Sequence, residues 1–445
     1  MRTGRKRSLS VVLIMIMVFT AVMASGAVTY AAEPDILIQP TDIWLWTDET
    51  RTIGIGLTEK ADSVEIQFYD DDMGNWIEWY DCKSQNTDKT MWYFDIPLGE
   101  FTPDFVEYTE RCRYAIHYDS GKTKYSEVFF ITWTKNADFG RIYGANRYET
   151  AMRVAESYLD ATESGKYSNV IIASGMDFAD ALGGTFLSVR RNAPIFLVNK
   201  SPQVIQDVAG NVQKNLTDGG RIYILGGTGA VSDEMEKALL AGGIEDWQIE
   251  RFAGKNRYDT NLMILRACGP VGMDVLVCSG TNFADALSAS AAGLPILLVG
   301  KSLTQEQKDF LKICSPRYVD VIGGEGAVSK AVFDQIHDEL DCAGSRVWGS
   351  NRYETSAKIA AKYFSDKQRF AVTLAYGQNF PDGLAGGPLS YAVGAPLLLV
   401  RPGNEKDACD VVKYSIRSHY AIVLGGPALI PDDLVWKVLD HKPKG

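Results

Sequence analysis

The sequence predicts an α/β protein of three similar units, preceded by a small all-β domain. Four short patterns recur three times in the same order, which indicates an internal repeat. Within each repeat, short apolar runs alternate with segments of helical periodicity. Strands that alternate with helices favour a parallel sheet that is covered by helices on both faces.

The repeat is defined by four patterns, each of which occurs once in every unit. They are RIYGANRYET, RFAGKNRYDT and RVWGSNRYET from Arg141, Arg251 and Arg346; ASGMDFADAL, CSGTNFADAL and AYGQNFPDGL from Ala173, Cys278 and Ala375; APIFLV, LPILLV and APLLLV from Ala193, Leu294 and Ala395; and ILGGTGAVS, VIGGEGAVS and VLGGPALIP from Ile224, Val321 and Val423. The first pattern recurs after 110 and 95 residues, so each unit has the size of a small domain.

The segment from Asp35 to Trp133 differs from the repeats in composition and in its hydrophobic pattern. Short runs rich in aromatic and β-branched residues, separated by turn residues, predict an antiparallel β-sandwich. Six of the nine tryptophans lie in this segment, namely Trp44, Trp46, Trp76, Trp79, Trp92 and Trp133. They are interpreted as core and strand-pair residues, and the alternative is an exposed aromatic platform for sugar. Cys82 and Cys112 fall in the same segment and could form a disulfide after export.

The chain has a formal net charge of -11, and the acidic excess is concentrated in residues 33–134, with 21 acidic and 8 basic residues. This balance argues against nucleic acid as a partner, because nucleic acids attract basic surfaces. Anion binding would therefore depend on arginines placed locally.

Basic residues precede an apolar run from Val11 to about Val28, which ends in small residues near Ala31. This is the layout of a signal peptide, and the alternative is an uncleaved membrane anchor. The predicted organisation is a signal peptide at 1–32, a β-sandwich domain at 33–134 and three repeats at 137–245, 246–341 and 342–445. We expect a secreted protein with no membrane contact after cleavage.

Three sets of equivalent polar residues are the candidate ligand-binding residues. They are Arg147, Arg257 and Arg352; Asn146, Asn256 and Asn351; and Asp180, Asp285 and Asp382. An arginine at the same place in every unit could form a forked contact with a carboxylate or phosphate, or could tie one unit to its neighbour. Thr150, Thr260 and Thr355, with the acids before them, are expected at a helix start.

The aspartates are expected to stabilise a first helical turn. Three equivalent carboxylates in like settings argue against a catalytic pair, whose members need different proton affinities. The Gly-rich segments lack dinucleotide-binding spacing and are interpreted as tight strand-to-helix turns. Metal-ligand spacings and nucleophile motifs are absent from the sequence, so no catalytic residue, metal or cofactor is expected.

Together the four patterns resemble the cell-wall-binding repeat 2 family, which occurs in three tandem copies in S-layer and other cell-wall proteins of Gram-positive bacteria. The resemblance covers about residues 137–440. It implies Rossmann-like or flavodoxin-like repeats packed as a pseudo-trimer. The β-sandwich domain before them, which the resemblance does not cover, is expected to be Ig-like. It also implies non-covalent anchoring to an anionic, teichoic-acid-like wall polymer, and places Ile195–Leu197, Ile296–Leu298 and Leu397–Leu399 near the binding grooves.

The third copy departs most from the pattern, with Pro381 and Gly383 beside Asp382 and with Ile430 and Pro431 in its Gly-rich turn. The leading hypothesis is a non-catalytic wall-binding protein at the cell surface. A wall-modifying enzyme with the N-terminal domain as effector and an S-layer lattice component are the alternatives. A protein or sugar ligand of the N-terminal domain also stays open.

Overall fold

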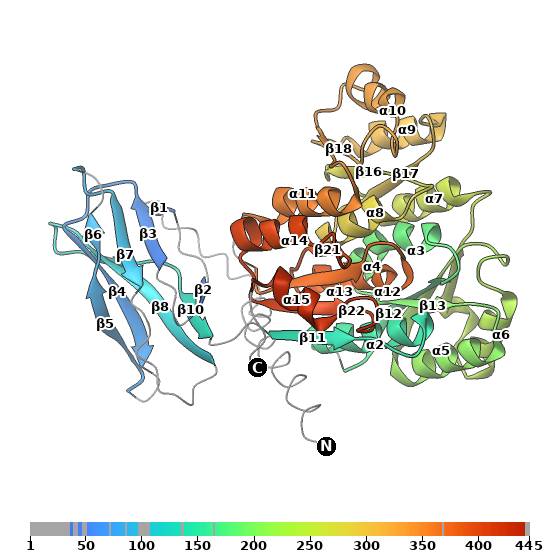
Figure 1. Cartoon of the computed structure of the whole chain (residues 1–445), viewed down its shortest axis with the longest axis horizontal. Coiled ribbons are helices and arrows are strands. Elements are labelled where there is room, and N and C mark those ends of the chain that lie inside the picture. Colours follow the sequence, from blue (N-terminus) through green and yellow to red (C-terminus); the bar gives the residue numbers. More distant parts are fainter. Residues whose placement is uncertain are drawn as a thin grey trace. The chain divides into compact units, whose positions relative to one another are not determined.

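The computed structural model describes residues 36–38, 43–46, 51–70, 73–84, 87–96, 107–134, 138–162, 165–366 and 369–440 (Figure 1). The predicted signal peptide at 1–32 lies outside these residues. Within the described part, no helix is both long enough and apolar enough to cross a bilayer. The chain divides into two compact parts, a β part that ends at Asp138 and an α/β part that begins at Phe139.

The β part consists of two sheets that share one core. The strands of the first sheet are, in spatial order, β1 (Ile36–Ile38), β3 (Arg51–Leu57), β7 (Met91–Ile96) and β6 (Lys83–Ser84). Those of the second are β2 (Ile43–Trp46), β10 (Phe129–Thr134), β8 (Glu107–His117), β4 (Ser63–Asp70) and β5 (Asn75–Asp81), with β9 (Thr123–Tyr125) on β8. The pairing is antiparallel except between β2 and β10, which run parallel.

The tryptophans of the β part divide between core and surface. Trp92 is buried in the core between the sheets, and Trp79 packs against that core. Trp76 lies on the other side of its strand, where the Arg113 guanidinium is 4.3 Å from its ring centroid. The core interpretation is therefore correct for Trp92 and Trp79, while the side chains of Trp44, Trp46 and Trp133 lie outside the described residues.

Cys82 and Cys112 are both buried and both free thiols. Cys82 bonds through its backbone to Val64 at one edge of β4, whereas Cys112 pairs with Phe68 at the other edge. Four residues of extended strand correspond to about 13 Å, which is too far for a disulfide. The alternative of a disulfide between these two cysteines is therefore wrong for this structure.

The α/β part contains three four-stranded parallel sheets with helices packed against them (Figure 1). The helices and strands of the first unit are α2 (Arg147–Ala161), β12 (Tyr167–Ser174), α3 (Ala179–Gly183), α4 (Thr185–Arg191), β13 (Ile195–Val198), α5 (Pro202–Asn215), β14 (Leu216–Leu225) and α6 (Asp233–Ala241), followed by β15 (Ile249–Phe252). Those of the second are α7 (Arg257–Cys268), β16 (Val275–Ser279), α8 (Ala284–Ala289), β17 (Ile296–Val299), α9 (Gln305–Cys314), β18 (Val319–Ile322) and α10 (Lys330–Asp334), followed by β19 (Arg346–Val347). Those of the third are α11 (Arg352–Phe364), β20 (Ala371–Tyr376), α12 (Pro381–Leu384), α13 (Gly386–Ala392), β21 (Leu397–Val400), α14 (Lys406–Val411), β22 (Tyr420–Leu424) and α15 (Asp432–Val438).

Each sheet borrows its edge strand from the start of the next repeat. The strand orders are β13-β12-β14-β15, β17-β16-β18-β19 and β21-β20-β22-β11, where β11 (Asp138–Ile142) precedes the first unit. The predicted boundaries at 246 and 342 assign β15 and β19 to the following repeat, so sequence repeats and sheets are offset by one strand. Because β11 completes the sheet of the third unit, the first residues of the α/β part pair with its last strand.

The units also contact one another in a cycle. Helix α3 packs on α7, α8 packs on α11, and α12 and α13 pack on α2. Together with the exchanged strands, these contacts close the three units into a ring. The central strands β16, β20 and the part of β12 from Val170 onward are mostly apolar and buried, as expected for sheets covered on both faces.

Candidate functional site

The NRYxT segments set the start of α2, α7 and α11. The side chains of Asn146, Asn256 and Asn351 each accept hydrogen bonds from the backbone amides two and three residues later. They are the N-caps of these helices, which saturates the amide oxygen of each asparagine within its own unit. Asn351 still lines the cleft described below.

The threonines lie deeper in the helix than expected. Thr150 follows the cap by four residues, and its hydroxyl accepts from the amide of Gly144 at 3.0 Å. Thr260 and Thr355 bind Gly254 and Gly349 in the same way, also at 3.0 Å. The expectation that they satisfy free amides at the helix start is therefore wrong, because the asparagines do so and the hydroxyls hold the preceding loop.

The three arginines lie at the interfaces between units. Each donates from Nη1 to a glycine carbonyl of its own unit, Arg147 to Gly175 at 2.8 Å, Arg257 to Gly280 at 2.8 Å and Arg352 to Gly377 at 2.7 Å. Each guanidinium also lies over a phenylalanine of the preceding unit in the ring, with Arg147 5.8 Å from Phe380, Arg257 5.5 Å from Phe178 and Arg352 5.2 Å from Phe283. These contacts are cation–π interactions across the interface.

Those phenylalanines form the centre of the ring. The ring centroids of Phe178, Phe283 and Phe380 lie 5.6 to 6.0 Å apart, with edge-to-face and tilted geometry. Each belongs to the segment that also carries Asp180, Asp285 or Asp382. The aromatic triangle therefore fixes where the three aspartate segments meet.

The aspartates are largely buried against the Gly-rich turns. The sites at which Gly226, Gly323 and Gly425 would carry a Cβ lie 2.5 to 3.0 Å from a carboxylate oxygen of Asp180, Asp285 and Asp382, respectively. Burial raises the pKa of all three carboxyls, and the arginine of the next unit acts in the opposite direction. Their place at the second position of a short helix agrees with the expected first-turn role.

The Gly-rich segments are tight turns, as the sequence predicts. Gly226, Gly323 and Gly425 have φ of 96°, 108° and 113°, which favours glycine. Their amides donate to the exchanged edge strand, for example Gly323 to the Val347 carbonyl at 2.8 Å. An adjacent carboxylate and an occupied amide both disfavour a phosphate at this turn.

The ring thus sorts the nine candidate residues into three equivalent sets, which we call the interface sites. The first interface site contains Asp180, Asn256 and Arg257; the second contains Asp285, Asn351 and Arg352; and the third contains Asp382, Asn146 and Arg147. Each set takes its aspartate from one unit and its asparagine and arginine from the next. No candidate residue is isolated from the others.

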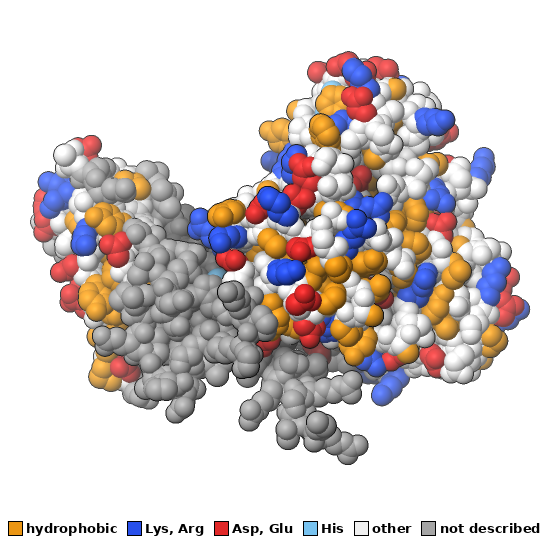
Figure 2. Space-filling model, in the orientation of Figure 1, with side chains coloured by type: hydrophobic (Ala, Val, Ile, Leu, Met, Phe, Trp, Pro, Cys, Tyr) orange, Lys and Arg blue, Asp and Glu red, His pale blue; other side chains and the backbone are white. Residues whose placement is uncertain are grey.

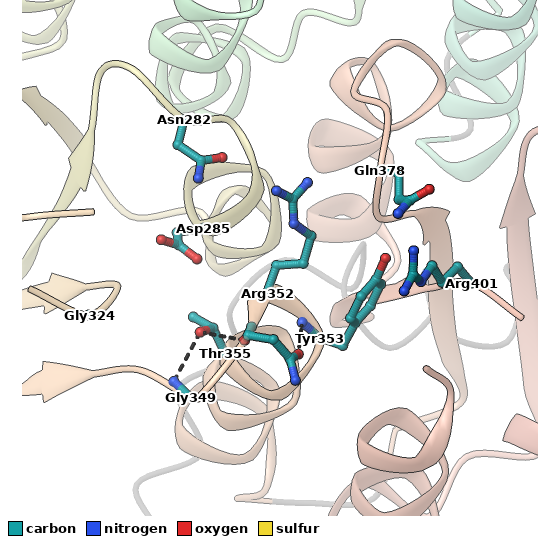
Figure 3. A pocket seen from close by; sticks show the side chains of 10 residues that line it. Asn282, Asp285, Gly324, Gly349, Arg352, Tyr353, Thr355, Gln378 and Arg401 are labelled. Atoms are coloured by element: carbon teal, nitrogen blue, oxygen red, sulfur yellow. Dashed lines mark hydrogen bonds between the residues drawn. The ribbon is translucent and has the colours of Figure 1, made fainter. Parts of the chain in front are cut away.

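The second interface site is hollowed into a cleft of about 640 Å³ (Figure 3). Besides the three candidate residues, it is lined by Asn282, Gly324, Gly349, Tyr353, Thr355, Gln378 and Arg401. Sequence reasoning missed Asn282, Tyr353, Gln378 and Arg401. Arg401 directly follows the apolar strand β21, so the end of that strand was the available signal.

The apolar strands that the resemblance places near the binding grooves are core strands. All four residues of β13, β17 and β21 are buried. What reaches the cleft is the residue after the strand, as Arg401 shows. The departures of the third copy, Pro381 and Gly383, flank Asp382 of the third interface site and not the cleft.

Charges on the face of the α/β part in Figure 2 are interspersed, with acidic and basic side chains side by side. The fold defines a protein of three tandem α/β repeats that are closed into a ring, with equivalent clusters of polar side chains where the units meet.

The comparisons with known proteins identify the family. The model described as "Cell wall binding domain 2 (CWB2)" matches residues 141–236, 251–333 and 346–435, so the chain belongs to this family. Two solved structures from Clostridium difficile share the fold. Cwp6 has a TM-score of 0.61 at 20% identity over 92% of this chain and 68% of its own, and Cwp8 has 0.60 at 23% identity over 77% and 60%.

Two curated relatives come from Bacillus subtilis (strain 168). N-acetylmuramoyl-L-alanine amidase LytC is 28% identical over 308 residues, 68% of this chain and 58% of the relative. The amidase enhancer is 31% identical over 278 residues, 61% of this chain and 36% of the relative. The chain thus spans 58% or less of the length of these relatives.

Proposed function

We propose that the chain holds itself non-covalently to the Gram-positive cell wall by binding an anionic, teichoic-acid-like polymer at its interface sites. The protein acts as an anchor at the cell surface and displays the N-terminal β part. Support comes from the family, which is a wall-binding family, and from Arg352, which lines an open cleft and forms no ion pair with any described residue.

Three sites on one rigid ring suit a polymer better than a small molecule. After one site has bound a repeating polymer, the next site meets the same polymer at a high effective concentration. Several weak sites together therefore give a high overall affinity. The ring fixes the spacing of the sites through the aromatic triangle, so no flexible linker weakens this gain.

We also propose that the chain is not itself an enzyme, although one relative is named an amidase. The three aspartates occupy equivalent positions and their pKa values shift in the same direction, whereas acid–base catalysis needs two groups held apart in proton affinity. In each sheet, the second strand of the unit lies at one edge beside the first strand, and the third strand lies on the other side of the first. This strand order supports a flavodoxin-like unit. The two facing sheets of the β part support the Ig-like assignment.

The test is co-sedimentation of the whole protein with purified walls, before and after acid extraction of their anionic polymers. We expect retention on intact walls, loss of retention on extracted walls, and no release of soluble wall fragments. Retention that survives extraction contradicts polymer anchoring, and released fragments indicate the wall-modifying enzyme. Ordered arrays of the protein on cells would indicate an S-layer component.

A further inference from the structure

The three interface sites differ at positions that their repeats align. The residue before the central phenylalanine is Asp177 in the first site, Asn282 in the second and Asn379 in the third. The residue that follows the apolar strand of the arginine's own unit is Gly300, Arg401 and Asn199 in the same order. The second site therefore has an additional cation, and the first has an additional acid.

The extra acid neutralises the first interface site. Asp177 accepts from Nη2 of Arg257 at 2.9 Å, so the guanidinium already holds a carboxylate where a ligand would bind. The sites of Arg352 and Arg147 have an asparagine at the aligned position, and neither arginine forms an ion pair with any residue the structure describes.

The second interface site also holds a buried donor without a partner. The Tyr353 side chain is 6% exposed, and its hydroxyl has no hydrogen-bond partner. Burial raises the pKa of this phenol, and the charges of Arg401 and Arg352 lower it, so both guanidinium groups lie close enough to act on the hydroxyl. The Arg401 guanidinium carbon is 5.7 Å from the Tyr353 ring. A buried hydroxyl without a partner is costly, which favours a ligand that supplies one.

The equivalent tyrosines lack this arrangement. The Tyr148 hydroxyl contacts the sulfur of Met176 at 3.3 Å, and Met176 stands where the second site has Gln378. Tyr258 lies beside Gly300, which offers no side chain.

The cations and the acid of the cleft lie apart. In Figure 3, Asn282 and Asp285 lie on one side of Arg352, and Tyr353, Gln378 and Arg401 lie on the other. The Asp285 carboxylate faces Gly323, whose Cβ position is 2.5 Å from it, and so is turned toward the Gly-rich turn. The side with two guanidinium groups, a hydroxyl and an amide is the one suited to an oxyanion with several acceptor oxygens.

An exposed tryptophan borders the same site. Trp348 is 51% exposed and its ring lies 3.6 Å from the Cβ position of Gly324, a residue that lines the cleft. Tyr143 takes this place at the third site and Ala253 at the first. A flat aromatic ring beside an anion site suits a sugar next to a charged group.

We propose that the cleft of the second interface site is the principal anchoring site and that it takes a phosphate group of a sugar–phosphate polymer. Arg352, Arg401 and the Tyr353 hydroxyl hold the phosphate, and Trp348 contacts the adjoining sugar. This inference rests on the proposed function, and it makes the three sites unequal, with the first the weakest.

The test compares single substitutions in the whole protein by co-sedimentation with purified walls. Arg401→Asn installs the residue of the first unit, and Asn282→Asp installs the acid that neutralises Arg257. The first variant removes one cation of the cleft, and the second neutralises the other. We therefore expect the apparent Kd for walls to rise about tenfold in each. Asn379→Asp makes the same change at the third site and is expected to weaken binding clearly less than the two cleft variants. Lys312→Gln, which removes a charge from the exposed face of α9, is the control and is expected to stay within about twofold.

The chemical class is tested by elution of the bound wild-type protein with inorganic phosphate or with acetate at equal ionic strength. Phosphate is expected to elute at a concentration about tenfold lower. Equal elution by the two anions contradicts a phosphate site. Equal weakening by Asn282→Asp and Asn379→Asp, or none by either cleft variant, contradicts a principal site but leaves wall anchoring intact.

Failure of the proposed function itself has a separate sign, which is wild-type retention on walls without anionic polymer. Thermal melting of every variant shows whether it is folded. Because Arg401 and Asn282 belong to different units, loss of folding in one variant still leaves the other to decide.

Discussion

Arg141 donates from Nη1 to the carbonyl oxygen of Gly425 at 2.9 Å, although 284 positions separate the two residues in the chain. Its Nη2 bonds to the Asp432 carboxylate at 2.7 Å, and the Arg141 side chain is only 11% exposed. The same bond joins Arg251 to Gly226 and Arg346 to Gly323, both at 2.8 Å. The bond of Arg141 differs from these two because it joins the first strand of the α/β part to the last unit, and so closes the ring.

Replacement of Arg141 should therefore destabilise the whole α/β part. We expect Arg141→Ala to lower the free energy of unfolding by roughly 2–3 kcal/mol, because a charge-assisted, mostly buried contact is lost. Urea unfolding followed by fluorescence measures the change. Arg153→Ala is the control, since Arg153 forms only an exposed ion pair with Glu149 and should cost under about 1 kcal/mol. Equal effects of the two substitutions contradict a closing role for Arg141.

The Gly-rich turns allow a second test of the structure. Gly323→Ala should lower the free energy of unfolding by roughly 1–3 kcal/mol, because φ is 108° and the new methyl group meets the Asp285 carboxylate at 2.5 Å. Gly326→Ala, three residues later in the same turn, meets no atom within 4 Å and should change it by about 0.5 kcal/mol or less. Thermal or urea unfolding of both variants suffices. If Gly323→Ala leaves the free energy of unfolding unchanged, the turn relaxes or the carboxylate moves, and the prediction is wrong.

Much of this architecture can be predicted from the repeat alone. Four recurring patterns and a strand–helix alternation lead to three parallel sheets, and equivalent arginines lead to equivalent sites. The helix cap was also within reach, because Asn146 is followed three residues later by Glu149, and an Asn-x-x-acid spacing is typical of a helix start. The prediction instead gave this role to Thr150, which is also a good cap residue but lies one turn too far along.

The exchanged strands are harder to predict. The run before each NRYxT segment adjoins its own unit's first helix in sequence, and nothing local shows that β15 completes the preceding sheet. That choice depends on the whole ring, in which Arg251 reaches the Gly226 carbonyl. The difference between Asp177 and Asn282 is visible in the aligned repeats, but its meaning requires knowing which arginine each residue faces.

The buried aspartates predict a pH dependence of stability. Burial raises the folded-state pKa of Asp285 above its ordinary 3.8. The folded protein then keeps this proton at pH values where the unfolded chain has lost it. The stabilisation that protonated Asp285 gives the folded state is complete below pH 3.8 and is lost as pH rises through the folded-state pKa. The stability of the wild type relative to Asp285→Asn should therefore fall over that window, as measured by urea unfolding across a pH series.

Glu354 supplies a comparison with the opposite sign. Hydrogen bonds from Lys358 and Ser350 lower its pKa to about 2. The stabilisation that ionised Glu354 gives the folded state is present above its ordinary pKa of 4.5 and is lost as pH falls toward 2. The wild type relative to Glu354→Gln should lose stability on acidification. If the Asp285 and Glu354 differences change with pH in the same direction, the assignment of Asp285 as a carboxyl with a raised pKa is wrong.

The last prediction concerns Arg147, Arg257 and Arg352 together. Single Arg→Gln substitutions should weaken wall retention moderately, and the triple substitution should abolish it, because linked sites reinforce one another through effective concentration. Among the singles, Arg257→Gln should matter least for retention, since Asp177 already occupies that guanidinium. Retention of the wild type should also fall with added salt, because salt screens exposed charges. Co-sedimentation over a salt series measures both effects.

The competing role for these arginines is structural, since each also holds a glycine carbonyl of its own unit and lies over a phenylalanine of the preceding one. Melting curves distinguish the two roles. If the arginines bind the polymer, the triple variant melts cooperatively close to the wild-type temperature and no longer sediments with walls. If each single substitution lowers the melting temperature sharply while the remaining folded protein binds walls normally, the arginines join the units and the polymer contacts the chain elsewhere.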